Sequence, residues 1–220
     1  MFEEYEFPVP DDVMKALSAF STATIHEAQG AIGAVDPGIR PVDRSMRFCG
    51  FARTVLTPPG DNLAVQAAID TVRPGEVVIV NSGGQPYGLF GDVLATAAQV
   101  RGACAFVTDA GVRDSDDIRE MGFPVFSGAV SIKGTKKERM GYVNIPIPFG
   151  GVIIHPGDVV CGDADGLVVV DPADAARVVD ACRAREDNEE RMRTVRLPAG
   201  ETMLEMGGHF EKVRRALESR

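Results

Sequence analysis

The chain has 220 residues, of which 45% are hydrophobic and 25% are charged, and its formal net charge at pH 7 is −9. This composition is typical of a globular protein, and the length suits one domain with a sizeable core. The acidic balance argues against nucleic acid as the main partner, because phosphate binding needs clustered Lys and Arg. No apolar run approaches the roughly 18 residues of a membrane span, and the acidic N-terminus lacks the layout of a signal peptide. We therefore expect a cytoplasmic protein with no membrane partner.

In the first half of the chain, helical and strand patterns alternate. Helices are predicted at residues 11–20, 22–29, 62–72 and 93–101, and strands at residues 48–56, 76–80 and 103–108. Ser21 is placed to cap the second helix and Gly30 to end it. The Gly- and Pro-rich stretch 31–47 is predicted to be a loop.

The second half is β-rich. A short helix is predicted at residues 116–120, followed by strands at residues 124–126, 143–147, 152–154, 159–161 and 167–170. Residues 172–193 predict one long charged helix. Without repeats or a low-complexity linker, we expect an N-terminal helical segment (1–20), one α/β domain (21–200) and a tail (201–220) with no core-like period.

The four cysteines are far apart in the sequence and form no C-x-x-C motif: Cys49, Cys104, Cys161 and Cys182. Three of them lie in or beside apolar strand-like runs, where cysteine behaves as a small hydrophobe. We expect four reduced thiols, with neither a disulfide framework nor a zinc site. The three histidines also lack metal-ligand spacing.

Three charged residues follow neighbouring predicted strands. Asp92 ends a glycine-bounded turn (88–92) that opens a helix, and Arg113 and Asp114 lie in a turn (109–114) that leaves the strand at 103–108. The strand at 76–80, this helix and the second strand make a βαβ unit, whose loops gather at the carboxyl ends of the strands. We therefore expect a helix N-terminus, two carboxylates and a guanidinium to meet at one point.

These groups suit a small 2-oxo acid. The backbone N–H groups of Gly91, Asp92, Val93 and Leu94 would bind its carboxylate at the helix N-terminus. Arg113 and a metal would stabilise charge on its keto oxygen, as in an enolate. The hard oxygens of Asp114 are the usual ligands of Mg²⁺ or Mn²⁺. The alternative is structural: Asp92 caps a helix, and Arg113 and Asp114 form an exposed turn pair.

Five segments carry a family resemblance: residues 23–30 (ATIHEAQG), 58–62 (PPGDN), 90–96 (FGDVLAT), 109–114 (DAGVRD) and 120–125 (EMGFPV). On these segments the chain resembles the class II pyruvate aldolases that act on 4-hydroxy-4-methyl-2-oxoglutarate and 4-carboxy-4-hydroxy-2-oxoadipate. These enzymes share a superfamily with the regulator of ribonuclease E activity A. The resemblance runs from about residue 21 to about residue 200. Asp92, then twenty residues, then Arg113 and Asp114 match the family's aldolase signature.

The resemblance implies a fold and a role for each residue. The fold would be α/β, a mixed-sheet β/β/α swivelling-type sandwich with flanking helices and a long C-terminal helix. Asp114 would ligate the metal, Asp92 would hold a metal-bound water and help position Arg113, and Arg113 would stabilise the pyruvate enolate. The site would lie between subunits of a homotrimer or homohexamer. Glu189 of a neighbouring subunit would contact a metal-bound water, with Glu190 and Glu186 as rivals.

Two features remain open. The neutral stretch 81–87 replaces the acidic residues that related aldolases tend to carry, and we expect it to line the pocket and affect substrate choice. His26, on the predicted helix 22–29, either supports substrate binding, from behind the residues that touch substrate or from a neighbouring subunit, or makes a packing or cap contact.

The sequence thus predicts a divalent-metal-dependent lyase that releases pyruvate from a 4-hydroxy-2-oxo acid, with oxaloacetate decarboxylation as a side activity. One alternative is a non-catalytic protein that inhibits a ribonuclease by contact. Another is an enzyme that uses enolate chemistry on a different 2-oxo or sugar acid.

Overall fold

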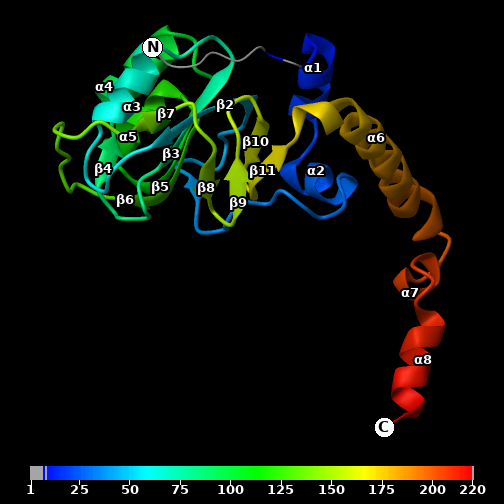
Figure 1. The fold of residues 1–220 in the computed structure, drawn as a ribbon. Helices are drawn as coiled ribbons and strands as arrows, with labels where there is room; N and C mark the ends of the chain where they lie inside the picture. The colour runs from blue at the N-terminus through cyan, green and yellow to red at the C-terminus, as the bar shows by residue number, and fades with distance from the viewer. Residues whose placement is uncertain (1–6, 8, 220) are drawn as a thin grey trace.

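The computed structural model in Figure 1 describes Phe7 and residues 9–219. The first part of the expected N-terminal segment (1–20) lies outside the described residues. Its remainder forms helix α1, Asp11–Ala19, which packs on helix α6, Ala175–Arg191. The expected division of the chain at residues 20 and 200 stays a prediction.

A mixed sheet forms the centre of the body, in the order β1-β6-β5-β3-β2-β10-β11. Its strands β2, β3, β5 and β6 are parallel, and β10 and β11 extend it antiparallel on the far side of β2. A separate two-stranded ladder joins β8 and β9. The strands are β1 Arg40–Pro41, β2 Phe48–Leu56, β3 Glu76–Asn81, β4 Gly88–Phe90, β5 Ala105–Val112, β6 Val125–Val130, β7 Tyr142–Val143, β8 Ile147–Phe149, β9 Val152–Ile154, β10 Val159–Asp163 and β11 Gly166–Val170.

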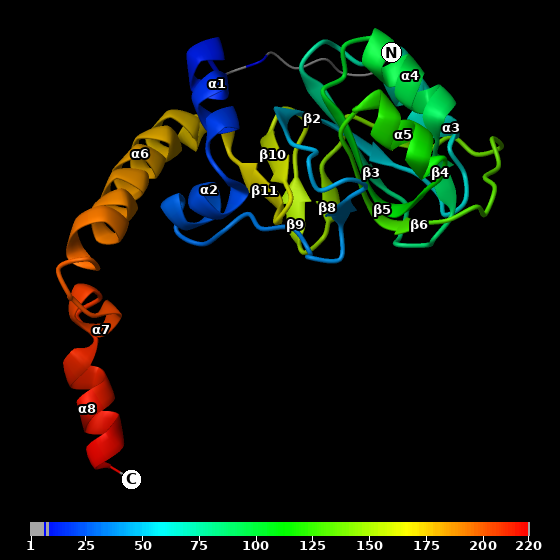
Figure 2. The same ribbon diagram turned by 180° about the vertical axis from the view of Figure 1, so that it is seen from behind.

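Helices cover the sheet in two groups, which Figure 2 shows from behind. One group lies over the parallel strands: α3 Leu63–Asp70, α4 Asp92–Val100 and α5 Ser115–Met121. The other lies by β10 and β11 and comprises α1, α2 (Thr22–Ala28) and α6. Each group buries its own apolar cluster against the sheet. The result is a mixed α/β domain with a long C-terminal helix, as expected.

The parallel strands read as nearly continuous apolar runs because both of their faces are covered. Val77, Val78, Ile79 and Val80 of β3 are all fully buried. The first cluster is filled by aromatic rings, and Phe90 stacks on Phe106 with ring centroids 3.8 Å apart. Beneath this layer, the charge of Arg53 is balanced by Glu76 at 3.2 Å. A buried charge is tolerated only when it is paired in this way.

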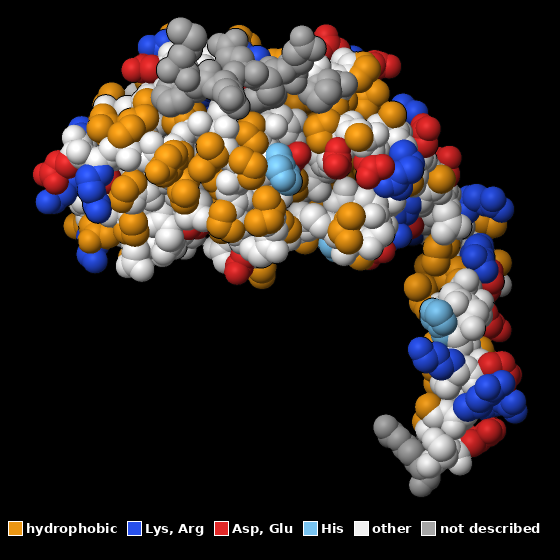
Figure 3. Space-filling view, in the orientation of Figure 1, with side chains coloured by type: hydrophobic (Ala, Val, Ile, Leu, Met, Phe, Trp, Pro, Cys, Tyr) orange, Lys and Arg blue, Asp and Glu red, His pale blue; other side chains and the backbone are white. Residues whose placement is uncertain are grey.

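Beyond α6 the chain continues as an arm that projects away from the body (Figure 1). It contains a π-helical turn at Met192–Arg196 and helices α7 (Met203–Met206) and α8 (Phe210–Glu218). None of these segments contains a buried residue, which agrees with the missing core-like period. Along one side of the arm, Figure 3 shows hydrophobic side chains, and Phe210, Val213 and Leu217 of α8 are exposed.

Three sequence expectations about the elements are wrong. Residues 88–90 form strand β4, which pairs with β5, and β5 continues to Val112, so most of 109–114 is strand. The expected strand at 143–147 is two strands, β7 and β8. Asn144 separates them because it adopts a left-handed conformation, with a φ of 58°.

Candidate active site

The pairing of β4 with β5 brings the three signature residues together. Gly88 lies opposite Gly111 and Phe90 opposite Val112, and the Arg113 N–H donates to the Phe90 carbonyl oxygen at 2.9 Å. The segments that follow β4 and β5 then leave the sheet at the same place. Asp92 begins α4 there, and Asp114 precedes α5. The expected meeting of these residues is confirmed, although a strand pair places them, not two turns.

The two segments approach each other most closely at Gly91. A Cβ atom on Gly91 would lie 2.2 Å from Oδ2 of Asp114 and 3.1 Å from Nε of Arg113. Only glycine permits this approach. Asp114 adopts the left-handed conformation, with φ 54° and ψ 42°, which is uncommon for a residue with a side chain. Such strain persists where surrounding contacts enforce it, and it is frequent at functional sites.

Two polar contacts orient the Asp114 carboxylate. Its Oδ2 accepts the Asp92 N–H at 3.3 Å and lies 3.3 Å from Nε of Arg113. The side chain of Asp114 is 32% exposed and that of Arg113 is 51% exposed. Arg113 therefore keeps most of its donors directed to solvent space while one end of its guanidinium is held. The Asp92 carboxylate makes no contact with Arg113, so the role of Asp92 in positioning Arg113 stays a prediction.

The N-terminus of α4 is open. No side chain caps it, and Gly91 at its N-cap has an extended backbone. The first-turn N–H groups of a helix have no intrahelical partners and carry partial positive charge. The Asp92 N–H donates to Asp114, which leaves the N–H groups of Val93 and Leu94 for an anion. Of the four N–H groups expected to bind an anion, that of Asp92 is therefore already used, and anion binding by the others stays a prediction.

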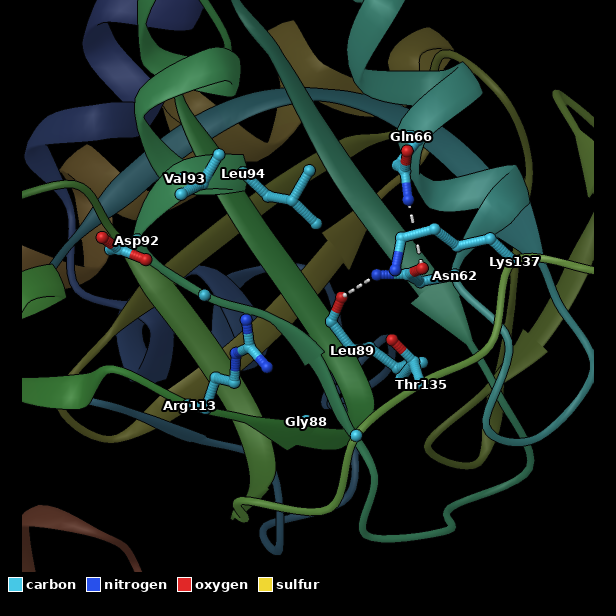
Figure 4. Close-up of a pocket in the computed structure, with 12 residues that line it drawn as sticks. Asn62, Gln66, Gly88, Leu89, Asp92, Val93, Leu94, Arg113, Thr135 and Lys137 are labelled. Carbon is cyan, nitrogen blue, oxygen red and sulfur yellow. Dashed lines mark hydrogen bonds between the residues drawn. The ribbon is translucent and has the colours of Figure 1, made fainter.

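Arg113 and the N-terminus of α4 line one end of a pocket of about 380 Å³. In Figure 4, Asp92, Val93, Leu94 and Arg113 lie on one side, and Asn62, Gln66, Thr135 and Lys137 lie on the other. The full lining is Asn62, Gln66, Gly88, Leu89, Gly91, Asp92, Val93, Leu94, Arg113, Gly134, Thr135 and Lys137. The volume falls within the range of small-molecule sites and exceeds what a three-carbon acid needs.

The loop that carries Thr135 and Lys137 is fixed by buried Asp61, which is only 1% exposed. The Asp61 carboxylate accepts the Leu63 N–H at 3.0 Å and the N–H groups of Glu138 and Arg139 at 2.9 Å each. Burial raises the pKa of Asp61, but these backbone hydrogen bonds outweigh burial and hold the pKa below its usual value. Lys137 lies next to Glu138 in this loop, and it makes no ion pair with any residue in the described ranges.

Three carboxylate oxygens at the α4 end are of the type that binds a divalent cation, and metal binding there stays a prediction. Oδ1 of Asp114 and both carboxylate oxygens of Asp92 have no hydrogen-bond partner among the described residues. Within those residues, no group of three or more His, Cys, Asp or Glu side chains could hold a metal ion. Mg²⁺ is normally bound through one or two carboxylates plus waters, so two aspartates are a sufficient donor set from one chain.

Glu189 lies elsewhere. It is on α6, at the other end of the body from α4 (Figure 1). Its carboxylate pairs with Arg185 at 2.9 Å and with Arg193 at 3.3 Å. It contributes nothing to the pocket of its own chain, and its contact with a neighbouring site stays a prediction, as does the choice between Glu189, Glu190 and Glu186.

The remaining sequence expectations have mixed outcomes. The Nδ1 atom of His26 lies 2.8 Å from the Ile32 carbonyl oxygen, a contact just beyond the end of its helix, and a role of His26 toward substrate stays a prediction. The expectation that 81–87 lines the pocket is wrong, because none of these residues is part of its lining, and Tyr87 lines a neighbouring pocket. Asp109 binds the N–H groups of Ser82 and Gly84, which draws that stretch away from the pocket.

Sequence reasoning missed Asn62, Gln66, Thr135 and Lys137. Two weak signals pointed to them: the PPGDN segment ends at Asn62, and residues 133–139 are rich in Lys and Arg. Neither signal locates a pocket, because the Asp61 contacts that join the two segments span more than 70 residues.

In the described ranges, no helix combines the length and apolar character needed to cross a bilayer.

Comparisons with known proteins identify the family of this chain. The family RraA-like, described as Aldolase/RraA, matches residues 22–169. A Halalkalibacterium halodurans protein named "putative 4-hydroxy-4-methyl-2-oxoglutarate aldolase" is 30% identical over 204 residues, which cover 92% of this chain and 95% of that protein.

Solved structures show the same fold. An uncharacterized protein from Pseudomonas syringae pv. tomato has a TM-score of 0.80 at 29% identity and covers 92% of this chain and 96% of its own. Streptomyces coelicolor RraAS2, described as an unusual member of the RNase ES inhibitor RraA protein family, has a TM-score of 0.75 at 28% identity, with 84% and 98% covered. The protein described here therefore belongs to the Aldolase/RraA family.

Proposed function

We propose that this protein is a divalent-metal-dependent lyase that cleaves the C3–C4 bond of a 4-hydroxy-2-oxo acid and releases pyruvate. The observation that carries the proposal is that Arg113 and the open N-terminus of α4 line one end of a pocket, with the Asp114 carboxylate in contact with both. A surface that only binds another protein has no need of this combination. Membership of the Aldolase/RraA family supports the same chemistry.

Binding begins at the helix N-terminus. The substrate carboxylate accepts the free N–H groups of Val93 and Leu94, where the helix dipole favours negative charge. This placement directs the adjacent keto oxygen toward Arg113, whose Nε is held by Asp114. The guanidinium then offers its remaining N–H donors to that oxygen.

Bond cleavage needs a base and an electron sink. A base, which we assign to a water held by Asp92, removes the proton of the C4 hydroxyl group. The C3–C4 electron pair moves toward C2 as the new carbonyl forms at C4, and negative charge collects on the keto oxygen. Arg113 stabilises that charge where it develops, which is worth more in the transition state than in the ground state. Protonation at C3 gives pyruvate.

Asp114 and Asp92 are the residues that would hold Mg²⁺ or Mn²⁺, through oxygens that have no other partner in the described part of the chain. When bound, such a cation supplies Lewis-acid polarisation of the keto group. Orientation of the Asp114 oxygens by the Asp92 N–H and by Arg113 supports this assignment.

The far end of the pocket favours a substrate with a second acid group. Lys137 supplies an unpaired positive charge there, and Asn62, Gln66 and Thr135 supply polar groups around it. This arrangement supports 4-carboxy-4-hydroxy-2-oxoadipate or 4-hydroxy-4-methyl-2-oxoglutarate as substrate. Oxaloacetate decarboxylation passes through the same enolate and is the expected side activity.

We also propose that the chain works as a homotrimer or homohexamer. Glu189 lies on α6, at the other end of the body from its own pocket, and the arm beyond α6 exposes Phe210 and Leu217 at 54% and 66%. Exposed apolar side chains at helical spacing are typical of a face that packs on another chain. Glu189 of a neighbouring subunit would then complete the metal site through water.

A second candidate is a non-catalytic inhibitor of a ribonuclease. It is favoured by the likeness to Streptomyces coelicolor RraAS2, which is described as belonging to an RNase ES inhibitor family. In this function Arg113 and Asp114 would be surface residues with no reaction to perform, and metal would have no effect on partner binding.

The test is pyruvate release from oxaloacetate and from 4-carboxy-4-hydroxy-2-oxoadipate, with Mg²⁺ and then with EDTA. We expect release from both substrates that EDTA abolishes. Release from oxaloacetate alone would keep the enolate chemistry and reject the proposed aldol substrate. No release from either, together with no binding of pyruvate or oxalate, would reject the lyase and favour the inhibitor.

A further inference from the structure

Two cysteines lie directly opposite each other in the sheet. Cys49 of β2 pairs with Cys161 of β10 in the antiparallel register. Their sulfur atoms are 3.2 Å apart, and the Cys161 thiol donates to the Cys49 sulfur. Both are free thiols in the structure. Although 112 positions separate them in sequence, no other residue lies between the two sulfurs.

The backbone geometry at this pair suits a covalent bond. The Ala52 N–H donates to the Asp158 carbonyl oxygen of the β10 side at 2.8 Å, whereas the Phe51 N–H points to the other side of β2 and donates to the Gly75 carbonyl oxygen. Because hydrogen-bonded and non-hydrogen-bonded pairs alternate along an antiparallel ladder, Cys49 and Cys161 form a pair of the second kind. Such pairs have Cα atoms about 4.5 Å apart, which is within the range that a disulfide spans.

The two thiols differ in access. Cys161 is 3% exposed and lies in the apolar cluster beneath α1, α2 and α6. Cys49 is partly exposed at the edge of that cluster. The hydrogen bond to Cys49, followed by burial, raises the pKa of the Cys161 thiol well above its usual value. Cys49 is therefore more accessible to a soluble oxidant, and the Cys161 thiol beside it stays protonated.

We propose that Cys49 and Cys161 form a peroxide-oxidation site in which Cys49 is the reacting thiol and Cys161 the resolving one. The Cys49 sulfur attacks one oxygen of hydrogen peroxide, the O–O bond breaks, and water leaves, giving a sulfenic acid on Cys49. The Cys161 sulfur then attacks the Cys49 sulfur, the S–O bond breaks, and a second water leaves with the Cys161 proton. Two thiols are oxidised to one disulfide and one peroxide is reduced to two waters.

Cys104 provides a natural control. Its sulfur packs against Gly50, the neighbour of Cys49 in β2, where a Cβ atom on Gly50 would lie. It is 3.6 Å from the Gly75 carbonyl oxygen. Burial raises the pKa of Cys104 to about 12, which keeps it protonated and unreactive. Cys182 is buried within the same cluster as Cys161, but its sulfur has no thiol partner among the described residues.

The test uses the full-length reduced protein, treated with increasing hydrogen peroxide, quenched by alkylation and mapped by mass spectrometry under non-reducing conditions. We expect an intramolecular link between the peptides that contain Cys49 and Cys161, formed before any change at Cys104 or Cys182. Dithiothreitol should restore both thiols. Cys104→Ser should form the same link at a rate within about 2-fold of the parent.

Two variants separate the roles. Cys161→Ser should leave a sulfenic acid on Cys49 that reacts with a dimedone probe, whereas Cys49→Ser should show no early oxidation at Cys161. Circular dichroism and the thermal midpoint of each reduced variant establish that it is folded. A link between Cys49 and Cys104, oxidation of all four thiols at one rate, or sulfinic acid on Cys49 without any link would overturn the proposal.

Discussion

The two ends of the pocket are built in different ways. At the α4 end, the positions of Arg113 and Asp114 follow from a strand pair, a left-handed backbone at Asp114 and a glycine, Gly91, whose missing side chain leaves room for the Asp114 carboxylate. At the far end, Lys137 sits on an exposed loop that Asp61 fixes through backbone hydrogen bonds. The first end is held by the main chain of a strand pair. The second is held by one buried carboxylate together with two main-chain hydrogen bonds, which join Lys136 to Gly60 and Asn62.

This difference indicates that the two ends of the pocket have separate roles. Groups that stabilise a transition state must be held to within a fraction of an ångström, which a backbone arrangement achieves. A group that selects a substrate acts mainly on binding and tolerates a looser mounting. Substitutions at the α4 end should therefore change the rate of reaction, and substitutions at the Lys137 end should change affinity.

Arg113→Ala should have the largest effect. Loss of the donors that stabilise the enolate is expected to lower kcat by about 10²–10³-fold. The half-exposed side chain packs little, so the thermal midpoint should stay unchanged. The measurement is steady-state pyruvate release, with Arg101→Ala, an exposed arginine paired with Asp70, as the matched control. Near-normal kcat in Arg113→Ala would remove the assigned role.

Asp114→Asn should remove the charge while keeping the shape, because Asn tolerates the left-handed conformation of this position. We expect activity to fall by about 10²-fold and to lose its response to Mg²⁺, since a carboxylate is the usual ligand of this ion. Isothermal calorimetry with Mg²⁺ measures the binding. Asp116→Asn, an exposed acid on the next turn, should bind Mg²⁺ as the parent does.

Gly91→Ala tests the close approach directly. The added methyl group would clash with Oδ2 of Asp114, so Asp114 and Arg113 must shift. Displacement of about 1 Å can cost about 10²-fold in rate, and we expect a loss of about 10- to 10²-fold in kcat. Strain should also cost about 1–3 kcal/mol in the free energy of unfolding. Gly134→Ala, where a Cβ meets nothing within 4 Å, is the control in the far wall.

Lys137→Gln should instead act on binding. For 4-carboxy-4-hydroxy-2-oxoadipate we expect KM to rise by about 5- to 10-fold, the scale of about 1 kcal/mol for a partly solvated charge pair, with kcat little changed. Exchange of pyruvate methyl protons with deuterium, followed by NMR, should be unaffected because pyruvate has no second acid group. Lys136→Gln, whose side chain pairs with Glu138 outside this pocket, is the control. An equal effect on both reactions would contradict these separate roles.

Asp61→Asn should have the smallest effect on rate and act on stability. At pH 7 we expect a loss of about 1–3 kcal/mol in the free energy of unfolding, because an amide cannot accept all three N–H groups. The lowered pKa of Asp61 means that its stabilisation is present above the unfolded value of about 3.9 and is lost as pH falls through the folded value. The difference between variant and parent should therefore shrink below about pH 4 in urea titrations. Asp187→Asn, an exposed acid on α6, is the control.

Local chemistry was enough to predict much of the fold. Apolar runs predicted β2 with the bounds that the structure has, and the Ser21 cap predicted the start of α2, where the Ser21 side chain accepts the Thr24 N–H at 3.1 Å. Strand β4 was missed because it is three residues long and glycine-rich. Its hydrogen bonds come from β5, which is distant in sequence, so no local pattern encodes it.

The sequence by itself determined the fold class, the βαβ unit and the signature residues Asp92, Arg113 and Asp114, since side-chain period and residue chemistry are local properties. Tertiary structure alone decided which end of Arg113 is held, that Gly91 admits Asp114, and that the Lys137 loop closes the pocket. It also decided that Cys49 and Cys161 face each other, because strand register depends on contacts between residues far apart in the chain.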